Sequence, residues 1–359
     1  MDIEIRPLQV PERVDAPEAA TFSEQLELGN ALEREVWGND DFDRTLDAVL
    51  PSYLDQRFER RIGMTAHLDG ELVGRGVVAY QRGEGETTAW LEVGVAPAAR
   101  RRGVGSALLA DAEAAALAEG RTIAEIATQH TVEQVQASAT RLGGSDGERV
   151  IPGDDPAVLW ALARGYTLGQ AERMNRCDVA AIASDLPQLI ADGERRSGAR
   201  YALRYWSGRT PSDLLDTMAN AREHMALDVP AGGLHVDAEH WSASRVENRD
   251  GQFIASGETP LGVAAIHLES GTIAGYSELI LTDGKQIAEQ YDTLVLADHR
   301  GHGLGMRLKA ANLRRLIDLA PERTRVYTWN ADENRYMLAI NDRLGFRVVG
   351  YTGIWQRAL

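Results

Sequence analysis

The sequence has a single cysteine, Cys177, among its 359 residues. One cysteine excludes an internal disulfide and any metal site built from several thiolates. Because free cysteine is commonly buried, we expect Cys177 to be a small core residue rather than a nucleophile. The histidines His224, His235, His240 and His267 do not form a metal-ligand spacing of the sort that zinc sites use, so the sequence predicts no metal.

Long apolar runs and an excess of positive charge are also lacking. No segment is apolar over the length that a bilayer-spanning helix needs. The N-terminal MDIEIRPL has no basic segment followed by an apolar one, so we expect no signal peptide and a cytoplasmic protein. Lysine and arginine total 38 against 54 acidic residues, a net charge of −16. That balance disfavours nucleic-acid binding, and it suits either solubility or the steering of a cationic substrate.

One stretch, Tyr291–Leu313, joins a predicted strand to a predicted helix through the loop Arg300-Gly301-His302-Gly303-Leu304-Gly305. Glycines at such a junction let the backbone approach a ligand closely. The first amides of the helix lack partners in the helix, and the helix dipole adds positive potential. The pattern therefore predicts a phosphate-binding loop, with Arg300 and His302 as supporting cations.

The same pattern occurs earlier, as Arg100-Arg101-Arg102-Gly103-Val104-Gly105 before an Ala/Leu-rich helix. The offset between the two loops is 303 − 103 = 200 residues, which indicates a long internal repeat. We therefore expect two domains, residues 1–190 and 191–359, with a boundary near residue 190.

These paired loops resemble those of the GNAT acyltransferases, in the tandem two-domain actinobacterial type that is similar to mycothiol-synthase-like acetyltransferases. The resemblance implies an α/β fold, with two tandem GNAT domains that each have a twisted mixed β-sheet flanked by helices. It also implies acetyl-CoA as cosubstrate. In the second half, it assigns the acetyl-CoA contacts to the strand Leu294, Val295 and Leu296, to the loop Arg300, Gly301, His302, Gly303, Leu304 and Gly305, and to the asparagines Asn330, Asn334 and Asn341.

The two halves depart from the family pattern in different ways. In the second half Asn334 fits the family asparagine, but Asn341 stands where a thiolate-protonating tyrosine is usual, with Tyr336 and Tyr291 as nearby alternatives. In the first half Asp154 and Trp160 stand at the asparagine and tyrosine positions. An acid repels a phosphate-rich ligand, so we expect the first half to be degenerate or structural and the second half to be catalytic.

Transfer to an amine needs a base to take the proton of the amine. Glu289 lies 300 − 289 = 11 residues before the loop arginine, a spacing that resembles that of histone-acetylating members. Asp292 resembles an acid of related tandem proteins, and Glu278 on the preceding strand is the third candidate. Alternation along the strand predicts that Glu289 and Asp292 point to opposite faces.

The sequence thus predicts direct acetyl transfer from acetyl-CoA to a primary amine of a small molecule, without a covalent acetyl-enzyme. The alternative is a non-catalytic acyl-CoA-binding or regulatory protein of the same fold. The expected partner is a small-molecule amine, with no nucleic acid and no membrane. The chain is expected to be a monomer with a pseudo-dimeric repeat, or a homodimer.

Overall fold

The computed structural model describes residues 2–83, 85–144, 148–228 and 230–359. The chain forms two compact units. The N-terminal unit comprises residues 1–171, 231–237 and 351–359, and the C-terminal unit comprises residues 172–230 and 238–350. The units therefore do not coincide with a single cut near residue 190, because each half of the sequence contributes segments to the other half's unit.

The N-terminal unit has a mixed sheet with strand order β1-β2-β3-β4-β5-β14. The neighbours β4 and β5 are parallel, and β1, β2, β3 and β4 are antiparallel to one another in turn. The strands are β1 (Ile3–Pro7), β2 (Glu59–Leu68), β3 (Glu71–Gln81), β4 (Thr88–Val95), β5 (Ile123–Thr131) and the last residues of β14 (Arg347–Ala358), with a small pair β6 (Arg141–Leu142) and β7 (Ile151–Pro152). The helices are α1 (Ala19–Trp37), α2 (Leu46–Leu54), α3 (Val104–Ala118), α4 (Val132–Ala137) and α5 (Pro156–Leu162).

The C-terminal unit has the strand order β8-β13-β12-β11-β10-β9. Here β12 and β13 form the parallel pair, and the other neighbours are antiparallel. The strands are β8 (Thr167–Asp178, with residues from 172 on in this unit), β9 (Tyr201–Ser207), β10 (Glu258–His267), β11 (Ile273–Thr282), β12 (Ile287–Val295) and β13 (Arg325–Ala331). The helices are α6 (Val179–Ile182), α7 (Leu186–Ser197), α8 (Leu215–Asp228), α9 (Ala243–Ala255), α10 (Leu304–Leu319) and α11 (Arg335–Arg343).

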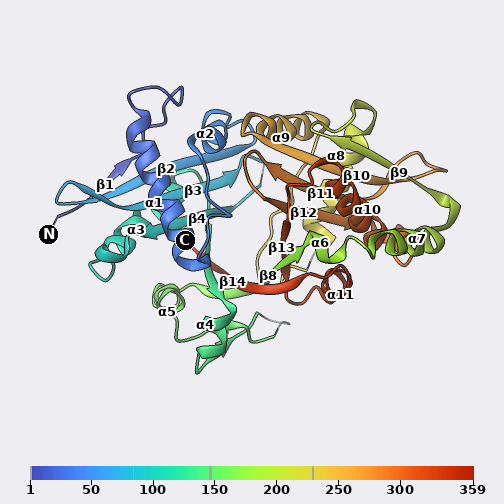
Figure 1. Cartoon of the computed structure of the whole chain (residues 1–359). Coiled ribbons are helices and arrows are strands. Elements are labelled where there is room, and N and C mark those ends of the chain that lie inside the picture. Colours follow the sequence, from blue (N-terminus) through green and yellow to red (C-terminus); the bar gives the residue numbers. More distant parts are fainter. Residues whose placement is uncertain (1, 84, 145–147, 229) are drawn as a thin grey trace. The chain divides into compact units, whose positions relative to one another are not determined.

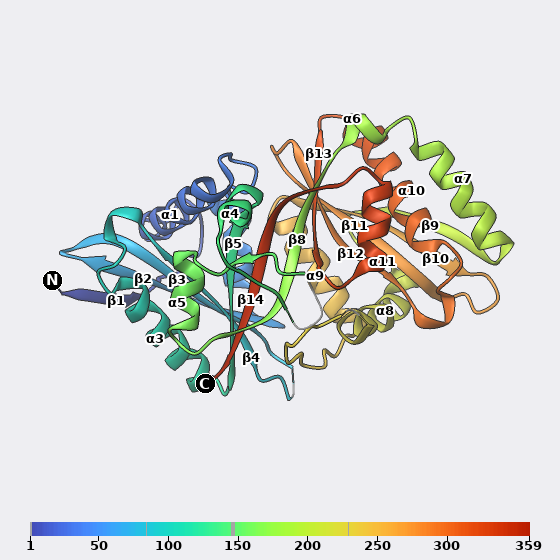
Figure 2. The same ribbon diagram turned by 90° about the horizontal axis from the view of Figure 1, so that it is seen from below.

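Helices cover both faces of the C-terminal sheet (Figure 1, Figure 2). One face packs on α7 and α10 through a core that includes Leu189, Leu279 and Leu313. The other face packs on α8 and α9 through a core that includes Met218, Val246 and Tyr276. A sheet that is buried on both faces holds its strands rigidly, and this rigidity positions the loops at the strand ends.

Local sequence signals correspond closely to several elements. The Asp69-Gly70 pair turns the hairpin of β2 and β3, with φ angles of 53° and 89°, as an Asp-Gly turn between alternating strands predicts. The C-terminal residues form one long strand, β14. The short helix α4 has a capping box at Thr131 and Gln134 that the sequence analysis did not identify.

Among the residues that the structure describes, no helix combines the length and the apolar character that crossing a membrane requires.

Candidate active site

The glycine-rich loop of the C-terminal unit lies between β12 and α10. Gly301 and Gly303 have φ angles of 81° and 73°, a left-handed conformation that costs residues with a Cβ. Gly303 is the N-cap of α10, so the first amides of the helix have no partner within the helix. A Cβ on Gly301 would meet no atom within 4 Å. The loop therefore fits a ligand that accepts backbone hydrogen bonds, as phosphate oxygens do.

Cationic side chains adjoin this loop. Nε of Arg300 donates to the carbonyl oxygen of Val295 at 3.1 Å, which ties the loop to the end of β12. Nη2 of Arg200 lies 3.0 Å from Nδ1 of His302. The guanidinium groups of Arg200 and Arg300 add positive potential to that of the helix N-terminus, and both sources favour an anionic ligand.

Next to the loop, β12 separates from β13. Their parallel pairing runs from Ile287 with Arg325 to Gln290 with Thr328, whereas β12 continues to Val295. Beyond Gln290, the edge of β12 therefore has no ladder partner in β13 among the described residues. Backbone groups on such an edge can bind an extended ligand, and the glycine loop follows directly.

A β-bulge interrupts β12 where the strands separate. The pairing of β12 with β11 is regular up to Gln290 and again from Thr293, but the register shifts by one residue between them. Tyr291 and Asp292 thus face the single residue Glu278. A bulge leaves one residue outside the ladder and re-aims side chains, and bulges are common beside active sites.

The bulge also determines which face each candidate carboxylate occupies. Glu289 pairs with Ile280, which shares a face with Glu278 by alternation. Asp292 and Glu278 bind the same arginine from α8. The expectation that Glu289 and Asp292 point to opposite faces is therefore wrong, because the extra residue in β12 breaks the alternation. All three carboxylates lie on the face that α8 and α9 cover.

Glu278 and Asp292 belong to a buried ion network. Arg222 of α8, which is 2% exposed, donates to Glu278 at 2.7 Å and to Asp292 at 2.8 Å. Arg249 of α9 lies 3.0 Å from Glu278, and the Tyr276 hydroxyl donates to Asp292 at 3.1 Å. Burial by itself raises the pKa of Glu278, but the charges of Arg222 and Arg249 outweigh it and lower that pKa to about 2. Glu278 is thus a permanently ionised structural anion and a very weak base.

Glu289 lies outside this network. It is half-buried on β12, beside Tyr327 of β13, one residue before the last pair of the parallel ladder. In the described part of the chain, Arg222 pairs with Glu278 and Asp292 and not with Glu289. Of the three candidate carboxylates, Glu289 is therefore the one that does not pair with Arg222. It lies one residue before the position where β12 and β13 separate.

The three asparagines near β13 have distinct partners. Asn334 is the N-cap of α11, and its side-chain oxygen accepts the Met337 amide at 3.1 Å. Asn341 is buried, accepts a hydrogen bond from Nζ of Lys309 at 2.7 Å and donates to Oδ1 of Asn330 at 2.6 Å. The structure therefore brings Asn330 and Asn341 together, whereas the oxygen of Asn334 caps a helix.

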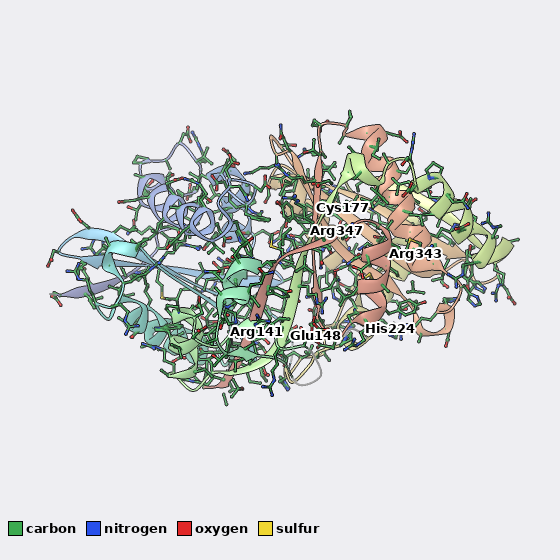
Figure 3. The ribbon with its side chains drawn as sticks, turned by 60° about the horizontal axis from the view of Figure 1, so that its bottom comes forward. Arg141, Glu148, Cys177, His224, Arg343 and Arg347 are labelled. Carbon is green, nitrogen blue, oxygen red and sulfur yellow. The ribbon has the colours of Figure 1, made fainter. Side chains whose placement is uncertain are left out.

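The remaining candidates of the second half lie around these groups. Tyr336 is 73% exposed and Tyr291 is 38% exposed, and the ring of Tyr291 packs edge-on against Phe253 of α9 at 5.7 Å. Cys177 is buried on β8, and its thiol donates to the Leu344 carbonyl at 3.3 Å (Figure 3). Burial raises the pKa of this thiol to about 12, so Cys177 stays protonated at neutral pH and is a poor nucleophile.

Leu294, Val295 and Leu296 close the strand that leads into the loop. Leu294 and Leu296 pack toward the α8 and α9 side, whereas Val295 packs toward α10. At the helix start, Leu304 is buried, and a Cβ on Gly305 would lie 3.0 Å from Cδ1 of Ile340 in α11. The glycine at 305 thus allows α10 and α11 to approach each other closely.

The N-terminal unit repeats the loop with different surroundings. Nε of Arg100 donates to the Val95 carbonyl at 3.1 Å, and Gly103 is the N-cap of α3 with a φ angle of 92°. Arg101 has a φ angle of 62° at the position that corresponds to Gly301. The guanidinium of Arg100 forms a two-point pair with Glu35, at 2.8 Å and 2.5 Å, and this carboxylate competes with a phosphate for the arginine.

The N-terminal counterpart of the strand junction is also different. The pairing of β3 with β4 runs without a register shift from Gly74 to Ala79, so β4 has no counterpart of the bulge in β12 over this range. Asp154 bonds Ser138 and the Ala139 amide. Nε1 of Trp160 would lie 3.8 Å from a Cβ on Gly105, so an indole occupies the space beside the loop.

In the described ranges, no group of three or more His, Cys, Asp or Glu residues is placed to hold a metal ion.

The paired glycine loops, each between a strand and a helix of a mixed sheet, define the GNAT class. The acetyltransferase (GNAT) family model matches residues 26–143 and 230–346, more than half of the chain. The chain belongs to this family and is an acetyl-CoA-dependent acetyltransferase with two GNAT domains.

Individual relatives span most of the chain. A mycothiol acetyltransferase of Mycobacteroides abscessus is 27% identical over 285 residues, which is 79% of either protein. A tandem GNAT protein from the clavulanic acid biosynthesis pathway has a TM-score of 0.75 at 24% identity, covering 99% of this chain and 98% of that one. A GCN5-related N-acetyltransferase from Sphaerobacter thermophilus has a TM-score of 0.59 at 14% identity, covering 99% and 95%. The two structures support the fold.

Arg222 and Lys309 are among the residues of the site that sequence reasoning missed. Both are charged and occur in helices, where a charge usually lies on the solvated face. Lys309 nevertheless falls between the buried residues Leu308 and Ala310. That position in a largely apolar stretch was the one available signal that Lys309 is buried.

Proposed function

We propose that the C-terminal unit transfers the acetyl group of acetyl-CoA directly to the primary amine of a small molecule. The observation that carries this proposal is the bulge in β12, which lies between the strand separation and the glycine loop and has no counterpart in β4. Bulged strands next to a ligand-binding loop are typical of active sites.

The residues that would hold acetyl-CoA are those of the strand end and the loop. The backbone of Leu294, Val295 and Leu296 offers hydrogen bonds to an extended arm. The amides from Gly301 to Gly305 offer a cradle for phosphate, with Arg300 and His302 beside it. Bound in this way, acetyl-CoA supplies an activated acyl group, and the chain supplies position and charge.

Glu289 is the proposed general base. A base must accept a proton from the amine during attack, and Glu278 holds its proton too weakly because two arginines stabilise its ionised form. Asp292 shares Arg222 with Glu278, so its charge is partly compensated. The proposed role of Asp292 is to fix Arg222 beneath the site.

The proposed acceptor is a small molecule, in keeping with the name of the relative from Mycobacteroides abscessus. The acidic net charge of −16 attracts a cationic amine before it binds. The proposed oligomeric state is a monomer or a homodimer.

The test is release of the CoA thiol from acetyl-CoA in the presence of a panel of amines that includes amino sugars, aminoglycosides and peptides. With an active acceptor, Glu289→Gln should lower kcat/KM by about 10²-fold, because a positioned base contributes on the order of 10²–10⁴-fold. The defect should shrink as the pH rises, since more of the amine is then already neutral.

Acetyl-CoA affinity serves as the control and should be unchanged in Glu289→Gln. Full activity of this variant at every pH would show that Glu289 is not the base and would make Asp292 the next candidate. Tight acetyl-CoA binding without turnover for every amine would instead favour a non-catalytic acyl-CoA-binding protein.

A further inference from the structure

A hollow of about 460 Å³ opens in the C-terminal unit where α10 ends. Its walls come from the last turns of α10 and from the ends of β9, β10 and β11. The volume is that of a site for a small molecule. Because an α-helix rises about 1.5 Å per residue, Leu319 in this wall lies roughly 22 Å along α10 from Leu304, where the glycine loop enters the helix. The hollow is therefore separate from the glycine loop.

The floor of the hollow is apolar. Leu261 of β10 pairs with Ser207 of β9. Two residues earlier on β10, Thr259 pairs with Leu281 of β11. By alternation these four side chains share one face of the sheet, the face whose core contains Leu261 and Leu281 together with residues of α10. Leu319, which is 59% exposed, adds a further apolar side chain from the helix, so the hollow favours a ligand with an apolar part.

One wall of the hollow carries a cation. Arg315 of α10 is half-buried, and its Nη1 donates to the carbonyl oxygens of Trp206 at 2.7 Å and Gly262 at 3.0 Å. These bonds hold the guanidinium against the sheet. Burial lowers the pKa of this group, and within the described ranges no carboxylate pairs with it. A guanidinium held in this way suits a carboxylate, which it can bind through two parallel hydrogen bonds.

The hollow also contains an anion without a partner. Asp283, which follows β11, is exposed, and its carboxylate makes no hydrogen bond or ion pair within the part of the chain that the structure describes. The hydroxyls of Ser207 and Thr259 are in the same state. The remaining charged residue of the lining, Arg323, is already engaged: its Nη1 donates to backbone carbonyls, and its Nε lies 3.3 Å from the Glu322 carboxylate.

Arg315 and Asp283 line the same hollow, yet they do not pair with each other. Space therefore remains between the two charges for a ligand that carries both signs. A simple carboxylate would be repelled by the net charge of −16, whereas a molecule with no net charge would not.

We propose that this hollow binds a small zwitterion, an α-amino acid with an apolar side chain. Its carboxylate binds Arg315, its ammonium binds Asp283, and its side chain lies over the leucines of the floor. The hydroxyls of Ser207 and Thr259 supply further hydrogen bonds. This site is independent of the proposed acetyl transfer.

The test is titration calorimetry without acetyl-CoA, with L-leucine as the ligand. Leucinamide lacks the carboxylate, and isocaproate lacks the ammonium. Wild type should show one saturable leucine site per chain. Each analogue should bind at least about tenfold more weakly, because each loses a charge-assisted hydrogen bond.

Two variants at exposed positions locate the site. Asp283→Asn should lower leucine affinity by about tenfold and leave the affinity for isocaproate unchanged, since isocaproate has no ammonium. Leu319→Glu places a carboxylate four residues after Arg315, on the same side of α10. That carboxylate competes for the guanidinium, so the binding of leucine and of isocaproate should both weaken.

Each variant has a matched control outside the hollow. Asp318→Asn makes the same change at an exposed aspartate that accepts hydrogen bonds from Arg314. Leu117→Glu makes the same change at a leucine of α3 that is 48% exposed. Both controls should bind leucine as wild type does.

Acetyl-CoA affinity should be the same in all four variants, which separates this site from the transfer site. Absence of saturable leucine binding at millimolar concentrations would overturn the inference. So would leucine affinities in Asp283→Asn and Leu319→Glu that equal those of their controls, because leucine would then bind elsewhere on the chain.

Discussion

The loops at residues 100–105 and 300–305 attach to their strands through the same contact, from an arginine Nε to a valine carbonyl at 3.1 Å. The side chains packed beneath them differ. In the helix that follows each loop, the N-terminal unit has Leu109 where the C-terminal unit has Lys309. A buried charge lowers the stability of the fold unless it is paired. Buried ionisable side chains with perturbed pKa values are common at functional sites. The difference is in keeping with the proposal that the C-terminal unit carries the chemistry, whereas the N-terminal unit uses the same position for packing.

The largest expected effect concerns the buried ion network. Glu278→Gln leaves Arg222 and Arg249 without their shared anion, so the free energy of unfolding should fall by about 3–5 kcal/mol. Urea denaturation of the C-terminal unit measures this loss. Glu269→Gln makes the same chemical change at an exposed turn and should stay within about 0.5 kcal/mol of wild type. Equal unfolding free energies for Glu278→Gln and Glu269→Gln would mean that the buried ion network does not stabilise the fold.

The next effect is a pH dependence that only the C-terminal unit should show. The pKa of Lys309 is about 7 in the folded protein against 10.5 for a free lysine. Between these values the unfolded chain binds the extra proton, so stability rises with pH above about 7 and the gain is lost as pH falls toward 7.

Lys309→Leu removes this titration. The increase in unfolding free energy from pH 7 to pH 9 should therefore be smaller in the variant than in wild type by about 2–3 kcal/mol. Denaturant midpoints at the two pH values measure the difference. If the unfolding free energies of wild type and Lys309→Leu changed with pH by the same amount, Lys309 would be exposed to water in solution rather than buried.

A smaller effect is expected at Asp292, which is partly exposed. Asp292→Asn keeps the hydrogen bond to Tyr276 but loses the charge beside Arg222, which Glu278 still holds. The unfolding free energy should fall by about 1–2 kcal/mol. The acid 200 residues earlier, Glu92, pairs with Arg75 at 3.3 Å, and Glu92→Gln should cost under about 1 kcal/mol. If Glu92→Gln lowered the unfolding free energy as much as Asp292→Asn does, or more, the proposed difference between the two units would be contradicted.

The smallest effect belongs to the exposed pair of Arg100 and Glu35. Both side chains are more than two fifths exposed, and exposed pairs contribute about 0–1 kcal/mol. Glu35→Gln should therefore change thermal stability by no more than that amount. It should also leave acetyl-CoA affinity at the strong site unchanged. A strengthened site would place that ligand in the N-terminal unit, because Glu35 would no longer compete for Arg100.

Much of this fold could be predicted from local patterns. The glycine loops, the Asp69-Gly70 hairpin and the amphipathic helices depend on residues close together in the chain, and these features are present in the structure. The bulge in β12 could not be predicted, because an extra residue becomes visible only when a strand is paired with its neighbour. The expectation about Glu289 and Asp292 failed for this reason.

The polar groups of the site were predictable only in part. Glu278 and Asp292 were identified as candidates, but their common partner Arg222 is 56 and 70 residues away in sequence. Lys309 and Asn341 are 32 residues apart and meet only because α10 and α11 pack together. Contacts of this kind arise from tertiary packing, which single-sequence patterns do not contain. The assignment of Tyr351–Leu359 to the N-terminal unit is another example.

The central claim is that acetyl-CoA binds and reacts in the C-terminal unit, and titration calorimetry with two matched variants tests it most directly. Gly303→Val and Gly103→Val place the same β-branched side chain at N-caps with φ angles of 73° and 92°, so both suffer similar backbone strain. The predicted result is one strong acetyl-CoA site per chain, which is lost in Gly303→Val and kept in Gly103→Val. Circular dichroism confirms that each variant is folded. Two equal sites in wild type, or loss of the strong site only in Gly103→Val, would contradict the account.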